Sequence, residues 1–337
     1  SPVLDRVIDV FENDFGARII AADMPVNLEA GKTYDVKLVV RNTSPDNWDG
    51  KKGYGFGCHW YYLDGTEAVW DAEVTPIKTP IPAGQPSVVS VKVTAPNYDG
   101  RWIAVFDLNV RGVWASTGDI TRGNDILVQE VNVAGGRLTF LDLSKLFDVT
   151  STSPDTDYAG GDFDGAGHSF PAEMMPPHFS VREPYSDVYP SGYLGKVSPG
   201  GRQDLKRISF RYGGKSAGEK NAVKCAGQEI ALPAGDYVNV HVLAAAVQSD
   251  QEAVFTLQFA SESRESKVTV NDWNSQSEEN AAFTVLHRHS SVGDERGIRC
   301  RLYHYVIPIE KSAGRLNSIK LPNNDKVRVF AITLEKP

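Results

Sequence analysis

The stretch Tyr34-Asp35-Val36-Lys37-Leu38-Val39-Val40 decides the fold class, because polar and apolar side chains alternate along it. Successive side chains of a β-strand point to opposite faces of a sheet, so this period of two is typical of a strand with one buried face. The same pattern recurs at residues 87–93 and 102–108, and Gly, Pro or Asn bounds each run. Short alternating strands between turn residues predict an all-β protein built from antiparallel β-sandwiches.

A break of small residues, Ala134-Gly135-Gly136, follows the strand expected at 126–133 and divides the chain. It predicts a boundary between two β-sandwich domains, over residues 1–136 and residues 137–337. A chain of 337 residues is long enough for two separate cores. Strands of the second sandwich are expected at 138–143, 238–243, 253–259, 267–270, 301–307 and 327–334.

Composition limits the partners of the chain. Hydrophobic residues make up 41% and charged residues 23%, which is ordinary for a folded protein. A net charge of -8 without clustered Lys and Arg argues against nucleic acid as a partner. No run approaches the roughly 18 apolar residues that a membrane helix needs, so a membrane is not an expected partner either. The first residues, Ser1-Pro2, are typical of a piece cut from a longer polypeptide.

Three cysteines, Cys58, Cys225 and Cys300, cannot all pair with one another, and none has the close spacing of a zinc site. We expect three buried thiols that pack as small hydrophobic side chains. A disulfide between Cys225 and Cys300 is the alternative.

The run from Gly160 to Glu173 is dense in glycine and acid, a composition that packing would not select. Asp162 and Asp164 within it are expected to form a structural corner, in which each carboxylate accepts backbone N–H bonds. Binding of calcium by these two carboxylates is one alternative, and direct contact with a ligand is another. An EF-hand is excluded, because no bidentate Glu follows at the end of the loop.

Several spaced segments resemble a known kind of module. They are 223–237, 241–246, Asn271-Asp272-Trp273, 301–305 and 329–334, and together they resemble the accessory β-sandwich module of secreted bacterial glycoside hydrolases and related polysaccharide-degrading enzymes. Residues 42–48, 80–84, 94–96 and Trp114 resemble the tryptophan-rich immunoglobulin-like modules that sit beside catalytic domains. The resemblance implies an immunoglobulin-like β-sandwich over residues 1–136 and a jelly-roll-like β-sandwich over residues 137–337. It also implies a secreted bacterial protein whose parent chain carries a catalytic domain and whose partner is a polysaccharide.

The candidate sugar-binding residues combine aromatic rings with polar neighbours. Trp273 lies beside Asp272 at the end of a strand, His168 closes the glycine-rich loop, and the irregular region up to residue 209 carries Tyr185, Tyr189 and Tyr193. An aromatic face takes the apolar surface of a sugar, while neighbouring polar groups take its hydroxyls. Packing in the core is the alternative role for Trp273. The other tryptophans are expected in the core of the first sandwich, with Trp48 and Trp70 nearest the surface.

Catalysis is not expected from this chain. No Asp or Glu pair is flanked by apolar residues that would raise one pKa, and His168, His178, His287, His289 and His304 are scattered among loops and strands. We therefore predict a non-catalytic carbohydrate-binding region that holds a secreted multimodular enzyme near its polymer, with no catalytic residues and no obligatory cofactor. The alternatives are structural modules that buttress a catalytic domain and, third, a β-sandwich glycosidase or lyase.

Overall fold

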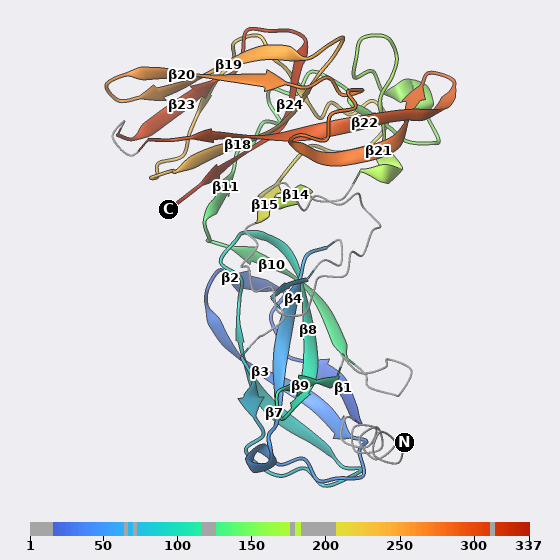
Figure 1. Cartoon of the computed structure of the whole chain (residues 1–337), viewed down its shortest axis with the longest axis vertical. Helices are drawn as coiled ribbons and strands as arrows, with labels where there is room; N and C mark the ends of the chain where they lie inside the picture. Colours follow the sequence, from blue (N-terminus) through green and yellow to red (C-terminus); the bar gives the residue numbers. More distant parts are fainter. Residues whose placement is uncertain are drawn as a thin grey trace, which may run out of the picture. The chain divides into compact units, whose positions relative to one another are not determined.

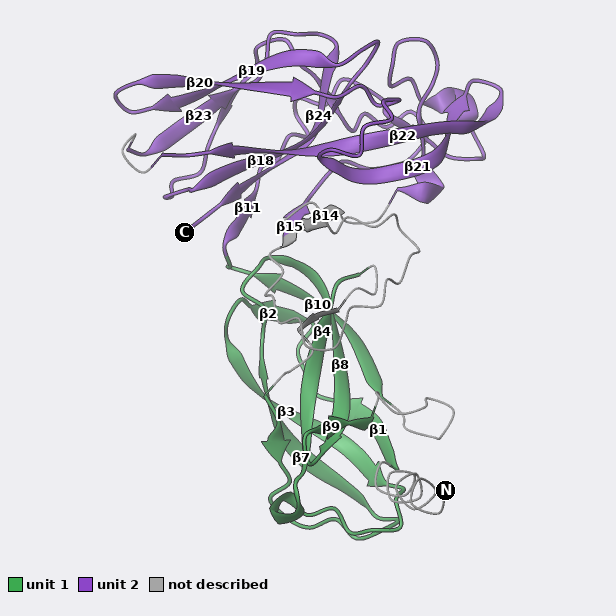
Figure 2. Cartoon of the chain, viewed as in Figure 1, with its two compact units in different colours: residues 1–136 green, residues 137–337 purple. Residues whose placement is uncertain are grey.

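The predicted strands are present in a computed structural model of the chain, which describes residues 16–63, 67–69, 73–115, 126–175, 179–182, 207–310 and 314–337 (Figure 1). The described residues are almost entirely β-strands and turns, with single 3-10 turns such as η1 (Gly50–Lys52), η4 (Tyr158–Gly160) and η5 (Ala172–Met174). None of the helical segments in these ranges has the length and apolar character needed to cross a membrane. The all-β prediction is confirmed. The chain divides into two compact units, Ser1–Gly136 and Arg137–Pro337 (Figure 2).

The first unit is a sandwich of two sheets. Its strands are β1 (Ala17–Ala22), β2 (Asn27–Glu29), β3 (Thr33–Asn42), β4 (Tyr54–Tyr61), β5 (Glu67–Val69), β6 (Thr75–Pro76), β7 (Pro86–Thr94), β8 (Gly100–Val110), β9 (Val113–Trp114) and β10 (Leu127–Ala134). One sheet has the order β1-β3-β7, and the other has the order β2-β10-β8-β4-β5, with β6 on β4 and β9 on β8. All pairs are antiparallel except β10 with β2.

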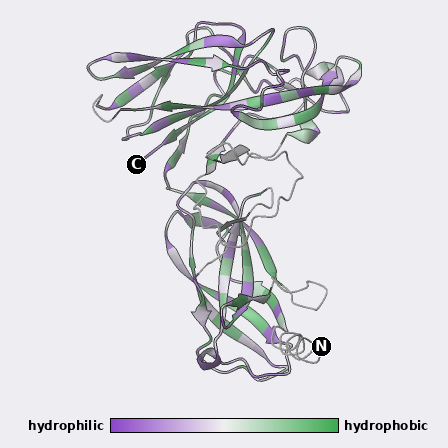
Figure 3. Cartoon of the chain, in the orientation of Figure 1, coloured by the Kyte–Doolittle hydropathy of each residue, from purple (hydrophilic) through white to green (hydrophobic). Residues whose placement is uncertain are grey.

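Alternation along the strands builds the core of this unit, as the changing hydropathy along each ribbon shows (Figure 3). In β3, Val36, Leu38 and Val40 are buried while the residues between them are exposed. They belong to one core cluster with residues of the other sheet, including Phe56 of β4 and Phe106 of β8. Because one face of β3 is buried and the other is exposed, the alternation of apolar and polar residues in the sequence predicted this strand correctly.

The described tryptophans of the first unit are core residues. Trp60, Trp102 and Trp114 are buried, as predicted. The expectation that Trp48 lies near the surface is wrong, because its ring is completely buried and packs edge-on against Phe56 at 5.7 Å. Trp70 lies outside the described residues.

The second unit has two larger sheets and two short ones. Its strands are β11 (Leu138–Phe140), β12 (Thr152–Ser153), β13 (Phe170–Pro171), β14 (Phe179–Arg182), β15 (Arg207–Phe210), β16 (Val223–Lys224), β17 (Glu229–Ala231), β18 (Asn239–Ala246), β19 (Gln251–Phe259), β20 (Ser263–Val270), β21 (Ala281–Ser290), β22 (Gly293–Pro308), β23 (Leu316–Lys320) and β24 (Val327–Glu335). One large sheet has the order β11-β24-β18-β22-β21, with β16 on β24, and the other has the order β17-β23-β19-β20. Both are antiparallel, and β12–β13 and β14–β15 form separate pairs.

Buried cysteines fill gaps in both cores. Cys58 lies in the first unit, Cys225 and Cys300 lie in the second, and all three are free thiols. This confirms the expected packing role and rules out a bond between Cys225 and Cys300 in this structure. Burial raises the pKa of Cys58 and of Cys225 to about 12, so both thiols stay protonated at neutral pH.

Candidate functional site

The β21–β22 hairpin carries a group of charged and imidazole side chains near its turn. Its register pairs Ser290 with Gly293, His289 with Asp294, and Arg288 with Glu295. Residues that pair directly across an antiparallel ladder share a face, and neighbours along a strand take opposite faces. The register therefore places His289 and Asp294 on one face of the hairpin, and Arg288 and Glu295 on the other.

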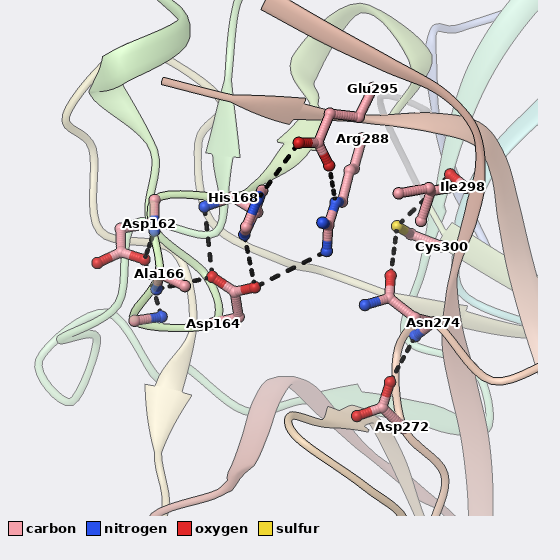
Figure 4. A network of polar contacts seen from close by, with 12 residues as sticks. Asp162, Asp164, Ala166, His168, Asp272, Asn274, Arg288, Glu295, Ile298 and Cys300 are labelled. Atoms are coloured by element: carbon pink, nitrogen blue, oxygen red, sulfur yellow. Dashed lines mark hydrogen bonds and ion pairs between the residues drawn. The ribbon is translucent and has the colours of Figure 1, made fainter. Parts of the chain in front are cut away.

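The glycine-rich loop approaches the Arg288–Glu295 face as a rigid corner (Figure 4). Asp162 Oδ1 accepts N–H bonds from Gly165 at 2.8 Å and Gly167 at 3.0 Å, and Asp164 Oδ1 accepts one from Ala166 at 2.9 Å. Gly165 and Gly167 have φ values of 79° and 82°, which side chains with a Cβ rarely adopt. The predicted structural corner is confirmed, because both carboxylates bind backbone donors of their own loop.

A closed ring of four side chains joins this loop to the hairpin (Figure 4). His168 Nδ1 lies 2.9 Å from Asp164 Oδ2, and His168 Nε2 lies 3.7 Å from Glu295 Oε1. Arg288 Nε donates to Glu295 Oε2 at 2.6 Å, and its Nη1 lies 4.0 Å from Asp164 Oδ2. We call these four residues, Asp164, His168, Arg288 and Glu295, the polar ring. Each of them is partly exposed, so the polar ring forms part of the surface.

Trp273 lies beneath the polar ring and not on the surface. Its side chain is 1% exposed and packs against Phe163 at 4.8 Å and Phe170 at 5.1 Å between ring centroids. The guanidinium of Arg288 lies 5.8 Å from its ring centroid. The prediction that Trp273 stacks on a sugar is therefore wrong, because a buried ring presents no face to a ligand. Its alternative role, packing in the core, is the observed one.

Asp272, the neighbour of Trp273, belongs to a polar turn near the polar ring. Its Oδ1 accepts the N–H of Asn274 at 2.8 Å, and the Asn274 side chain contacts Cys300 Sγ at 3.1 Å (Figure 4). Burial raises the pKa of Asp272, while the Asn274 N–H opposes that rise. Asp272 is half-buried, so it is less available to a ligand than the sequence suggested.

The remaining sugar-binding candidates, Tyr185, Tyr189 and Tyr193, lie outside the described residues, as does His178. His168, a predicted sugar-binding residue, is partly exposed and lies next to the hairpin. Arg288 and Glu295 were missed, although charged residues of opposite sign on both sides of a tight turn are a signal for a cross-strand pair.

The opposite face of the hairpin carries a second group, the histidine cluster: His287, His289, Asp294, Asp155 and Glu173. The side chain of His289 is completely buried, and its Nε2 lies 3.2 Å from Asp155 Oδ1 and 3.5 Å from Asp294 Oδ1. His287 Nε2 lies 3.6 Å from the same Asp294 oxygen. Asp155 lies in the turn after β12 and Glu173 lies in η5, and the Asp155 N–H donates to Glu173 Oε1 at 2.9 Å.

Neighbouring side chains fix the ring of His289. Its Nδ1 lies 3.0 Å from Ser153 Oγ, which in turn lies 2.6 Å from Ser169 Oγ. Tyr158 packs edge-on against the imidazole at 4.6 Å between centroids. Burial lowers the pKa of His289 and outweighs the opposite effect of Asp155 and Asp294, so the neutral ring is favoured.

Among the residues that the structure describes, the histidine cluster offers donor atoms that could hold a metal ion. Its members offer donor atoms within 4.8 Å of one another in two overlapping sets, His287/His289/Asp294 and Asp155/Glu173/His289. The sequence interpretation treated these histidines as scattered. The spacing of His287 and His289 in one strand was the available signal, because residues i and i+2 share a face.

The fold defines an all-β protein of β-sandwich type, with clustered polar side chains on both faces of the β21–β22 hairpin. Residues 188–337 match the AziU2-like beta-sandwich domain family, which agrees with the fold of the second unit. No curated protein matches the chain.

Solved structures with local similarity are distant. A CARDB domain from Pyrococcus furiosus, solved in complex with di-metal ions, is 11% identical over 36% of this chain and 90% of its own, with a TM-score of 0.23. The C-terminal domain of wzt is 14% identical over 37% and 77%, with a TM-score of 0.24. The beta-glucosidase of Listeria innocua in complex with glucose is 15% identical over 36% and 16%, with a TM-score of 0.22. Similarity at this level carries no argument about function.

Proposed function

We propose that this chain is a non-catalytic carbohydrate-binding region of a secreted, multimodular, polysaccharide-active protein, and that its second unit contacts the polymer. The observation that carries the proposal is the polar ring. Its carboxylates, imidazole and guanidinium are planar groups that can bind neighbouring sugar hydroxyls in pairs. We therefore assign the contact with the sugar to the surface above Trp273, and no longer to Trp273 itself.

The contacts that anchor the polar ring support the proposal. The corner formed by Asp162 and Asp164 anchors one side, the hairpin anchors the other, and Trp273 forms a packed floor under Arg288. Side chains that are ordered before binding lose little conformational entropy when a ligand arrives. Because a shallow polar surface gives weak contacts, one such site should bind in the micromolar to millimolar range and gain strength from other sites on the parent chain.

Affinity electrophoresis in gels cast with neutral and acidic polysaccharides tests the proposal. At least one polymer should retard the full chain, and His168→Ala with Glu295→Gln should abolish most of that retardation. Glu310→Gln is the matched control, because Glu310 is an exposed, ion-paired glutamate on another part of the unit. A second variant, with Tyr185, Tyr189 and Tyr193 changed to Ala, tests the tyrosines of the irregular region.

Two results would overturn the proposal. If no polymer retards the chain, the structural role of buttressing a catalytic domain is favoured. If the purified chain releases reducing ends from a polysaccharide, and one acid substitution abolishes that release, the chain is an enzyme.

A further inference from the structure

We propose that the histidine cluster binds one divalent transition-metal ion, with zinc as the best fit, through His287, His289, Asp294 and Asp155. This site is separate from the polar ring, because it lies on the other face of the β21–β22 hairpin. The inference therefore does not depend on sugar binding.

Three distances between donor atoms match those expected around a tetrahedral ion. Zinc–nitrogen and zinc–oxygen bonds of roughly 2.0–2.1 Å place tetrahedral ligands about 3.4 Å apart. His289 Nε2 lies 3.2 Å from Asp155 Oδ1 and 3.5 Å from Asp294 Oδ1. His287 Nε2 lies 3.6 Å from that same Asp294 oxygen. Asp155 belongs to the second donor set, which shares only His289 with the first, so the exposed side chain of Asp155 would rotate to complete the coordination.

The state of His289 points independently to a ligand. Its Nε2 is buried and makes no hydrogen bond, although carboxylate oxygens of Asp155 and Asp294 lie within 3.5 Å of it. A buried polar atom without a partner is costly, and a bound cation would satisfy it. The Ser153 hydroxyl on Nδ1 holds the ring in this orientation, an arrangement typical of metal-binding histidines.

Charge also favours a cation here. Asp155, Glu173 and Asp294 bring three carboxylates around two imidazoles. Arg296 lies near Asp294, but it is 85% exposed and contacts Oδ2 at 3.6 Å, whereas Oδ1 is the oxygen near the histidines. Two nitrogen donors favour zinc and similar ions over calcium and magnesium, which prefer oxygen ligands. Such an ion would tie the hairpin to the loop that carries Asp155.

Isothermal titration of the untagged, chelator-treated full chain with zinc chloride tests the site. We expect one zinc per chain, and we expect Asp294→Asn and His287→Asn each to weaken binding about tenfold or more. Asp157→Asn is the matched control, because Asp157 is an exposed aspartate in the same loop but not in the cluster. Cobalt should give the visible absorption of a tetrahedral nitrogen–oxygen site, and a large excess of calcium should not displace zinc.

The proposal fails if zinc does not bind, if calcium displaces it, or if Asp294→Asn and His287→Asn bind zinc as tightly as the unmodified chain. These variants change partly exposed side chains, and a thermal melt in chelator checks that they fold. A fold-preserving loss of zinc binding, with unchanged retardation by polysaccharide, would separate this site from the proposed sugar site.

Discussion

Replacing Trp273 by alanine tests whether this residue is structural. The ring is 1% exposed, and its two Phe contacts are at 4.8 Å and 5.1 Å. Truncation of a buried Trp costs about 3–5 kcal/mol, of which each aromatic pair accounts for about 0.5–1.5 kcal/mol. For a unit of this size, about 1 kcal/mol lowers the melting temperature by roughly 2–4 °C. We therefore expect the transition of the second unit to fall by about 6–20 °C.

Differential scanning calorimetry of the full chain is the suitable assay, because Trp273 is the only tryptophan of the second unit and its removal deletes the fluorescence signal of that unit. Trp273→Phe is the matched control, since it keeps an aromatic ring in the core and should lower the transition less. A loss below about 1 kcal/mol, combined with weaker retention on a polysaccharide, would refute the buried role and restore the stacking role.

Three further predictions concern the same unit and the thiols. Gly165→Ala should destabilise the second unit by about 1–2 kcal/mol in urea titrations, because φ is 79° and a Cβ would meet no other atom, so that backbone strain is the only cost. Gly165→Asn should cost less, since Asn adopts positive φ more readily than Ala. If Gly165→Ala is as stable as the unmodified chain, the strain is absent. The pKa of Asp272 is raised, so its ionisation destabilises the fold as pH rises above about 3.9. Asp272→Asn keeps an acceptor for Asn274, so the stability of this variant relative to the unmodified chain should be higher at pH 7 than at pH 3. The opposite trend would exclude this cause. Native Cys58 and Cys225 should resist alkylation at pH 8 until the chain is unfolded, as mass spectrometry can measure, because burial raises the pKa of each to about 12.

The strands could be predicted from the sequence because their signal is local. The alternation at residues 34–40 corresponds to β3, in which Val36, Leu38 and Val40 face the core. The corner of Asp162 and Asp164 could also be predicted, since both its acceptors and its donors lie within six residues. In each case the residues that determine the structure are close together in the chain.

The role of Trp273 could not be predicted in the same way. Asn and Asp residues surround it in the sequence, which suggests a surface turn. Its packing partners, Phe163 and Phe170, lie about a hundred residues earlier, and only the folded unit brings them together. Trp48 was placed near the surface for the same reason, because the polar turn around it conceals its contact with Phe56.

The two faces of the β21–β22 hairpin carry different sets of charged side chains, and this difference supports the two proposals. On one face, the guanidinium of Arg288 lies between the carboxylates of Glu295 and Asp164, so a side chain of the protein itself balances their negative charge. On the other face, the buried imidazole of His289 lies 3.2 Å from Asp155 Oδ1 and 3.5 Å from Asp294 Oδ1. The first face is therefore suited to a neutral, hydroxyl-rich ligand. The second has an excess of negative charge and two nitrogen donors, which is the condition under which a bound metal ion stabilises a loop and a hairpin together.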